Sequence, residues 1–358
     1  MKRFLVFLTI LAVAVLSFDP SAKAQTCTPC SLTISTVWAS PIAATSGMII
    51  CVTPTGSITG DILINGGTVC NEGYIGSAHL LILNGDLQNN GILDVDSLSQ
   101  DGPSSRVFNL DSFTVSANSI YNGSQFYNYG HYTSTNTSVF YGGQFISPQG
   151  QMSCTNFSVF DEDTAQAPAT LYLELPTTFS CDSLFVHNAH FMNDGEATVH
   201  YDFRASGVAE VTNNEYLWIG RDFSNDSLSQ FYTHCMVHIG RNWSNAGIMN
   251  GPTTGCGGFS VVGLTGNYGI FGQTGHLDMC DASNPGSFDI NLGTLGTGVT
   301  FCTCTDSCVY YEGISEQQVL HSLNATVYPN PFDETLSLDV FSSQAGRMTL
   351  SVFDVVGQ

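Results

Sequence analysis

Twenty residues separate two closely matching stretches, Ile219-Gly220-Arg221-Asp222-Phe223-Ser224-Asn225 and Ile239-Gly240-Arg241-Asn242-Trp243-Ser244-Asn245. Twenty residues before the first, Val199, Asp202 and Phe203 stand at the matching apolar, polar and aromatic positions. The rows continue to the apolar residues Val208, Leu228 and Ile248. A fixed period of this length is the signature of a repeat architecture, so the repeat determines how the rest of the chain is interpreted.

A second recurring feature is an asparagine followed two residues later by a glycine. The pairs are Asn89 and Gly91, Asn128 and Gly130, Asn193 and Gly195, Asn245 and Gly247, and Asn267 and Gly269. Both residue types tolerate a left-handed backbone, so we expect a sharp turn at each pair. The apolar runs between the turns have strand length, none keeps a 3.6-residue period, and 36 glycines interrupt the chain. The pattern predicts an all-β protein.

A period of about 20 residues with strands and no helices favours a right-handed parallel β-helix, or solenoid, over residues 25–305. Successive turns of such a fold lie about 4.8 Å apart, so equivalent side chains stack on one another. An array of β-sandwich domains with several short strands each is the alternative.

The twelve cysteines are expected to form disulfides if the chain is exported. We expect Cys27 and Cys30 to pair with each other, with a redox-active motif as the alternative. Cys154 and Cys181 stand three residues before Phe157 and Leu184, so they are equivalent positions and disulfide candidates if their turns are adjacent. The cluster Cys302, Cys304 and Cys308 is likewise assigned to disulfides, with a zinc site as the alternative.

The N-terminus predicts export. Lys2 and Arg3 precede an apolar run over residues 4–18 and a small-residue site at residues 22–24, the order of a signal peptide ending at residue 24. Its removal takes three of the eight basic residues and one of the thirty acidic ones, leaving a formal charge of −24 and no lysine. The mature chain therefore has no basic patch for nucleic acid and no lysine for Schiff-base chemistry.

A polar linker is predicted at residues 306–322, and residues 323–358 form the last segment. This segment opens with Tyr328, Pro329, Asn330, Pro331 and Phe332, followed by apolar alternation at Leu336, Leu338 and Val340. It resembles the type A C-terminal sorting domain of type IX secretion substrates from Bacteroidetes-type bacteria. The resemblance implies part of a small Ig-like β-sandwich, truncated at Gln358, and the type IX machinery as a partner. It also implies passage through the periplasm to a secreted or outer-membrane cell-surface location.

The repeat also creates a polar column. Asp202, Asp222 and Asn242 would stack along one side of a strand, and Tyr201, Arg221 and Arg241 along the other. Parallel β-helix enzymes that cleave acidic polysaccharides use carboxylates and arginines on such a face. Asp202, Asp222, Arg221 and Arg241 are therefore weak catalytic candidates, although repeats produce such columns without any function.

The remaining motifs add no catalytic signature. The acidic run Asp161, Glu162 and Asp163 lacks a recognised calcium spacing and is assigned to a solvated loop, so no metal site or cofactor is predicted, with calcium as the one ion left open. Ser97, Thr164, Ser183 and Ser227 lie in tripeptides of aspartate, hydroxyl and apolar residue, which resemble O-glycosylation sites of this bacterial group. Turn formation is the alternative explanation.

Two functions follow as hypotheses. The first is an exported, non-catalytic β-repeat protein, adhesin-like or surface-binding, with carbohydrate or another surface as its ligand. The second is a polysaccharide lyase or glycoside hydrolase on the same scaffold. Fold analogy does not choose between them.

Overall fold

The structure is a computed structural model that describes residues 27–162, 167–304, 323–328 and 337–342. The chain divides into one unit up to Thr305 and a second from Asp306 onward, and each is described by itself. Every regular element of the described residues is a β-strand, and no helix among them is long and apolar enough to cross a membrane. The signal segment 1–24 and the linker 306–322 lie outside the described residues.

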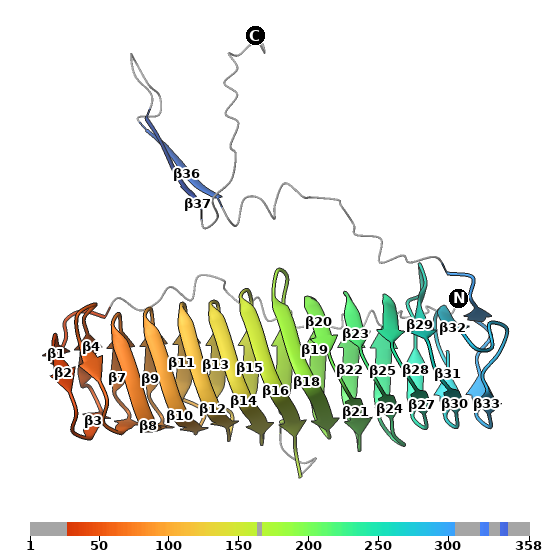
Figure 1. The fold of residues 1–358 in the computed structure, drawn as a ribbon, viewed down its shortest axis with the longest axis horizontal. Coiled ribbons are helices and arrows are strands. Elements are labelled where there is room, and N and C mark those ends of the chain that lie inside the picture. Colours follow the sequence, from red (N-terminus) through yellow and green to blue (C-terminus); the bar gives the residue numbers. More distant parts are fainter. Residues whose placement is uncertain (1–26, 163–166, 305–322, 329–336, 343–358) are drawn as a thin grey trace, which may run out of the picture. The chain divides into compact units, whose positions relative to one another are not determined.

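The first unit is a parallel β-solenoid of about 13 turns, with strands that follow one another along its length (Figure 1). One wall is a 14-stranded parallel sheet. Its strands are β1 (Leu32–Ile34), β4 (Ile49–Val52), β7 (Thr68–Asn71), β9 (Asp86–Asn89), β11 (Arg106–Asn109), β13 (Gln125–Asn128), β15 (Gln144–Ser147), β17 (Thr170–Leu173), β19 (His190–Asn193), β22 (Glu210–Asn213), β25 (Gln230–Thr233), β28 (Ile248–Asn250), β31 (Ile270–Phe271) and β34 (Thr294–Leu295).

The remaining strands of the solenoid form the other walls. Near the N-terminus they are β2 (Val37–Trp38), β3 (Ile42–Thr45), β5 (Ser57–Ile58) and β6 (Ile62–Asn65). The middle turns use long strands, β8 (Tyr74–Leu83), β10 (Ile92–Asp101), β12 (Ser112–Ile120), β14 (His131–Phe140), β16 (Gln151–Phe160) and β18 (Thr178–His187). Later turns split them into β20 (Glu196–Val199), β21 (Phe203–Ser206), β23 (Leu217–Ile219), β24 (Phe223–Asn225), β26 (Met236–Ile239), β27 (Trp243–Asn245), β29 (Gly257–Val261), β30 (Thr265–Asn267), β32 (Leu277–Asp281), β33 (Ile290–Asn291) and β35 (Val299–Phe301).

The register confirms the 20-residue repeat. Ile219 lies opposite Ile239, and Phe223 opposite Trp243. The predicted match of Val208, Leu228 and Ile248 is wrong at its last member. Val208 and Leu228 are exposed corner residues, whereas Ile248 lies on a strand opposite Gln230. The row is wrong there because the corner between β27 and β28 is shorter than the one between β24 and β25.

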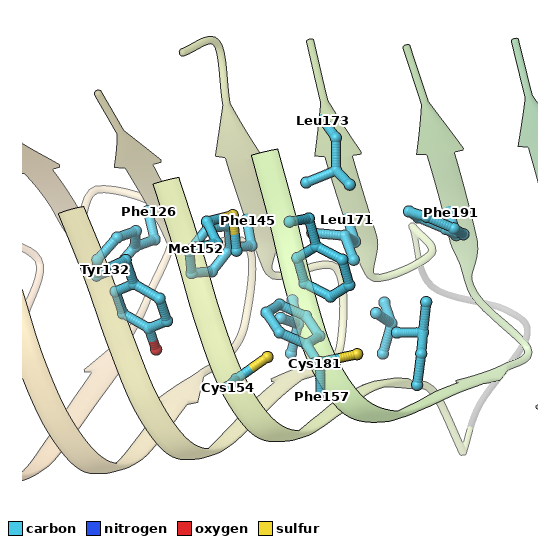
Figure 2. Packing of buried hydrophobic residues seen from close by; sticks show 14 of the residues in the cluster. Phe126, Tyr132, Phe145, Met152, Cys154, Phe157, Leu171, Leu173, Cys181 and Phe191 are labelled. Atoms are coloured by element: carbon cyan, nitrogen blue, oxygen red, sulfur yellow. The ribbon is translucent and has the colours of Figure 1, made fainter. Parts of the chain in front are cut away.

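The core is built from the inward residues of each turn. Phe203, Phe223 and Trp243 are each about 1% exposed, and the rings of Phe203 and Phe223 stack with centroids 5.5 Å apart. Figure 2 shows the same arrangement in the middle turns, where side chains from all walls meet along the axis. Because each turn buries its inward side chains against those of the next, a single turn cannot fold alone.

The predicted turns exist, but the reason given for them is wrong. The asparagines are buried strand-end residues that form amide ladders, such as Asn89 Nδ2 donating to Asn109 Oδ1 at 2.8 Å. None of the five glycines that follow them has a positive φ. Glycine stands at Gly91 because a Cβ there would collide with the carbonyl oxygen of Gly73 in the preceding turn. Close approach of two backbones, rather than a left-handed conformation, sets this position.

Disulfides lie toward both ends of the solenoid. Cys27 bonds Cys70 and Cys30 bonds Cys51, with Cα atoms 6.0 and 5.8 Å apart. The predicted Cys27–Cys30 pair is therefore wrong, because each cysteine reaches a different strand, β7 or β4. These pairs are compatible with an extracellular or secreted protein.

The cysteine cluster near residue 304 is divided between two disulfides. Cys256 bonds Cys304 and Cys280 bonds Cys302, with Cα atoms 6.2 and 4.4 Å apart. Cys302 and Cys304 are therefore not zinc ligands, in agreement with the disulfide assignment, and Cys308 lies outside the described residues.

The second unit is described over one antiparallel pair, β36 (Leu323–Tyr328) and β37 (Ser337–Ser342), with Val327 opposite Leu338. The predicted alternation at Leu338 and Val340 falls on β37. Residues 329–332, which complete the sorting motif, lie outside the described residues, so the Ig-like sandwich and the sorting role stay predictions.

Candidate functional site

The predicted polar column lies at the corner that joins β23 to β24 and β26 to β27. Arg241 forms a two-pronged ion pair with Asp222, its Nε lying 2.8 Å from Oδ1. Arg221 Nε lies 3.7 Å from Asp202 Oδ1, and its guanidinium stands over the Tyr201 ring. The arginines and carboxylates thus face one another across successive turns instead of occupying opposite sides of a strand.

Each aspartate of the column also accepts a hydrogen bond from the backbone of the next turn. Asp202 Oδ1 accepts the backbone N–H of Asp222 at 3.3 Å, and Asp222 Oδ1 accepts that of Asn242 at 3.2 Å. The hydrogen bond from Arg241 lowers the pKa of Asp222 below its ordinary value. A carboxylate that is already ion-paired and hydrogen-bonded is a poor proton donor, so the column is suited to holding the corner together.

A groove lies on the wall next to this corner. It has a volume of about 340 Å³ and opens to solvent. Its lining consists of Tyr216, Trp218, His238, Ile239, Gly240, Ser260 and Val262. Trp218, His238 and Ser260 are register partners on β23, β26 and β29, which places them in one outward row. Alternation along each strand sends Leu217 and Ile219 into the core and leaves Trp218 outside.

Two glycines lie at or beside the groove: Gly240 lines it, and Gly220 lies against the Trp218 ring. Gly220 and Gly240 directly follow the two strands, and a Cβ at Gly220 would lie 2.8 Å from Cη2 of Trp218. The indole therefore lies against bare backbone. The Tyr216 ring stands 6.2 Å from His238, and the His200 ring 6.2 Å from Trp218. The result is an aromatic platform with polar groups at its side.

The platform and the polar column are neighbours in the chain, because Gly220 precedes Arg221 and Gly240 precedes Arg241. The same Ile-Gly-Arg repeat therefore supplies the core residue, the glycine at or beside the groove and the paired cation. Sequence reasoning missed Trp218 and Tyr216. The detectable signal was an aromatic residue at the outward position directly before a repeated Ile-Gly-Arg.

A second groove of about 360 Å³ lies on the 14-stranded wall. Its lining is Gln144, Ile146, Thr170, Tyr172, His190, Phe191, Met192, Glu210 and Thr212. His190 Nε2 lies 3.4 Å from Glu210, and the Tyr172 hydroxyl donates to Asp194 at 2.9 Å. Burial, with the charge of Asp194 next, raises the pKa of Glu174. Glu210 is the carboxylate that lines this groove, while Glu174 lies outside the lining; a carboxylate next to a histidine in a groove is an arrangement that an acid–base enzyme could use.

The other predicted positions lie apart from both grooves. Asp161 is buried and accepts the backbone N–H of Ala169 at 2.6 Å, so the solvated-loop assignment is wrong for it: its carboxylate holds a corner. Within residues 27–162 and 167–304, no three His, Cys, Asp or Glu side chains gather as metal ligands.

The four hydroxyls proposed for glycosylation differ in exposure. Ser227 is exposed in the corner before β25, whereas Ser97 and Ser183 are half-buried on β10 and β18. Thr164 lies outside the described residues. Ser227 is thus the most accessible of the three described hydroxyls.

Comparisons of the chain with protein-family models, with curated proteins and with solved structures found no match.

Proposed function

We propose that this is an exported, non-catalytic β-solenoid that binds carbohydrate on a surface through the groove of Tyr216, Trp218 and His238. The observation that carries the proposal is the groove lined by Tyr216, Trp218 and His238, with the Trp218 ring lying against the backbone at Gly220. A flat exposed ring contacts the C–H face of a sugar, while neighbouring polar groups bond its hydroxyls. The groove opens to solvent, so a segment of a surface polysaccharide could enter it from outside.

Delivery by type IX secretion is part of the proposal. It is supported by the signal-peptide pattern over residues 1–24 and the motif over residues 328–332. The disulfides are compatible with a chain that folds in an oxidising compartment. We place the protein at the outer-membrane surface or in the medium, reached through the periplasm.

The experiment is binding of the purified mature chain to a panel of immobilised neutral and acidic polysaccharides. Trp218→Ala should weaken binding at least about tenfold, because truncating a central aromatic contact costs more than about 1.4 kcal/mol. Trp38→Ala is the matched control, since Trp38 is 39% exposed on β2 at the N-terminal end of the solenoid. Equal affinity of both variants would exclude this groove as the binding site.

A polysaccharide lyase or hydrolase is the second candidate, and the groove with Tyr172, Glu210 and His190 is the observation that favours it. The same panel is therefore assayed for cleavage, with and without calcium. Cleavage that is lost in Glu210→Gln but kept in Asp222→Asn would establish an enzyme at the second groove. Binding without cleavage would support the carbohydrate-binding function.

A further inference from the structure

Two cysteines face each other in the interior of the solenoid. Cys154 on β16 lies directly opposite Cys181 on β18 in the parallel register. Both are buried, with 7% and 1% exposure, and both are free thiols in this structure. Figure 2 shows the two side chains next to each other on neighbouring strands. The two turns are adjacent, so the condition under which the sequence made these cysteines disulfide candidates is met.

The same chain joins two neighbouring turns through a comparable pair, in which the second cysteine, Cys302, directly follows the end of β35. Met279 lies opposite Phe301, so the next residues, Cys280 and Cys302, face each other on neighbouring turns. They are bonded, with Cα atoms 4.4 Å apart. Parallel strands lie about 4.8 Å apart, within the 4.4–6.8 Å that disulfides span. The Cα separation expected between Cys154 and Cys181 from their register thus falls within the range that a disulfide spans.

The surroundings show when oxidation has to happen. Burial, with a hydrogen bond to Cys154 next, raises the pKa of the Cys181 thiol. A buried thiol is a poor nucleophile, because the thiolate is the reactive form. Oxidation therefore belongs to the stage before the turns close over the pair.

We propose that Cys154 and Cys181 are oxidised to a disulfide that joins β16 to β18 in the exported protein. The thiolate of one cysteine attacks the disulfide of a protein oxidoreductase or of an oxidised small thiol and forms a mixed disulfide. The thiolate of the second cysteine then attacks this mixed disulfide and releases the oxidant as a thiol. One S–S bond forms and one is broken, the two cysteines lose two electrons and two protons, and the oxidant leaves as two thiols.

The position of this bond gives it a role. Gln151 lies opposite Thr178, 27 residues later, whereas Ile92 lies opposite Ser112, 20 residues later. The turn between β16 and β18 is therefore lengthened by an insertion. The proposed disulfide closes that turn, in the same way as Cys30–Cys51 and Cys280–Cys302, 21 and 22 residues apart in sequence, close theirs.

The arginine positions give a direct test. Trypsin cuts denatured chain after Arg106 and Arg204, and the released fragment 107–204 holds Cys154 and Cys181 as its only cysteines. The full chain is exported to an oxidising compartment and purified. It is then denatured in the presence of an alkylating reagent, which blocks free thiols, and digested without reductant. We expect a fragment that carries no alkyl group and is about 2 Da lighter than after reduction. Alkylation of both cysteines, or linkage of the fragment to another peptide, would overturn the proposal.

A second cut identifies the bond itself. Cleavage at Glu174 separates the two cysteines, so the pieces should stay together until a reductant is added. In thermal unfolding, Cys154→Ala, Cys181→Ala and the double variant should lower the midpoint by similar amounts, because any one change removes the whole cross-link. Additive shifts would mean two independent thiols and would contradict the disulfide.

Discussion

At the scale of the residue, the ion pair of Asp222 and Arg241 makes a testable contribution to stability. The folded-state pKa of Asp222 lies below its ordinary value of 3.8, chiefly because Arg241 hydrogen-bonds the carboxylate. A depressed pKa stabilises the fold at pH values above the unfolded pKa, and this contribution is lost as the pH falls through the folded pKa. Asp222→Asn should therefore lower the melting temperature near neutral pH, with a difference from wild type that disappears in acid.

The matched control is Asp94→Asn, which removes an exposed carboxylate on β10. Its melting curve should follow that of wild type at both pH values. A difference for Asp222→Asn that persists unchanged at a pH below the folded-state pKa of Asp222 would show that the shape of the side chain, and not its charge, stabilises this corner.

At the scale of the element, the asparagine ladders hold the strand ends of successive turns in register. Asn71 Nδ2 donates to Asn89 Oδ1, and Asn89 Nδ2 donates to Asn109 Oδ1, both at 2.8 Å and both buried. Asn89→Ala leaves a buried donor and a buried acceptor without an amide partner. We expect a loss of about 2 kcal/mol in the free energy of unfolding, measured by urea denaturation.

The surface offers a comparison for this ladder. Asn156 Nδ2 donates to Asn136 Oδ1 at 2.9 Å, but this pair is exposed, so water replaces the lost bond. Asn156→Ala should change stability by less than about 0.5 kcal/mol. Equal losses in the two variants would show that burial does not determine the strength of these ladders.

The elements also show what the sequence could predict. The spacing of Ile219 and Ile239 was sufficient for the fold, because solenoid turns repeat the core residue at fixed offsets. The pairing of Cys27 and Cys30 was not predictable, since disulfide connectivity depends on which strands become neighbours in space. Trp218 escaped notice because its row, Thr198, Trp218 and His238, does not conserve one residue type along the repeat.

At the scale of the whole solenoid, the disulfides toward the ends should limit fraying. Each turn of a solenoid contacts only its neighbours, so a terminal turn has half the contacts of an internal one. Removing one of the two bonds near the N-terminus with Cys30→Ser/Cys51→Ser should speed amide hydrogen exchange in β1 and β4, the strands nearest that end. Exchange in β32 and β35 should stay at the wild-type rate.

The reciprocal variant, Cys280→Ser/Cys302→Ser, should loosen β32 and β35 and leave β1 unchanged. Mass spectrometry of peptides from each region measures the exchange rates at both ends of the solenoid in one experiment. Faster exchange along the whole length in either variant would contradict a nearest-neighbour solenoid and indicate one cooperative unit.

The stacking of about 13 turns also fixes a length. With a rise of about 4.8 Å per turn, the solenoid measures about 60 Å along its axis. Because the 14-stranded wall advances by one strand per turn, this reach is set by the number of repeats and not by flexible linkers. Gain or loss of a 20-residue unit would change the length of the solenoid by one turn, so the number of repeats encoded in the gene determines how far the protein extends.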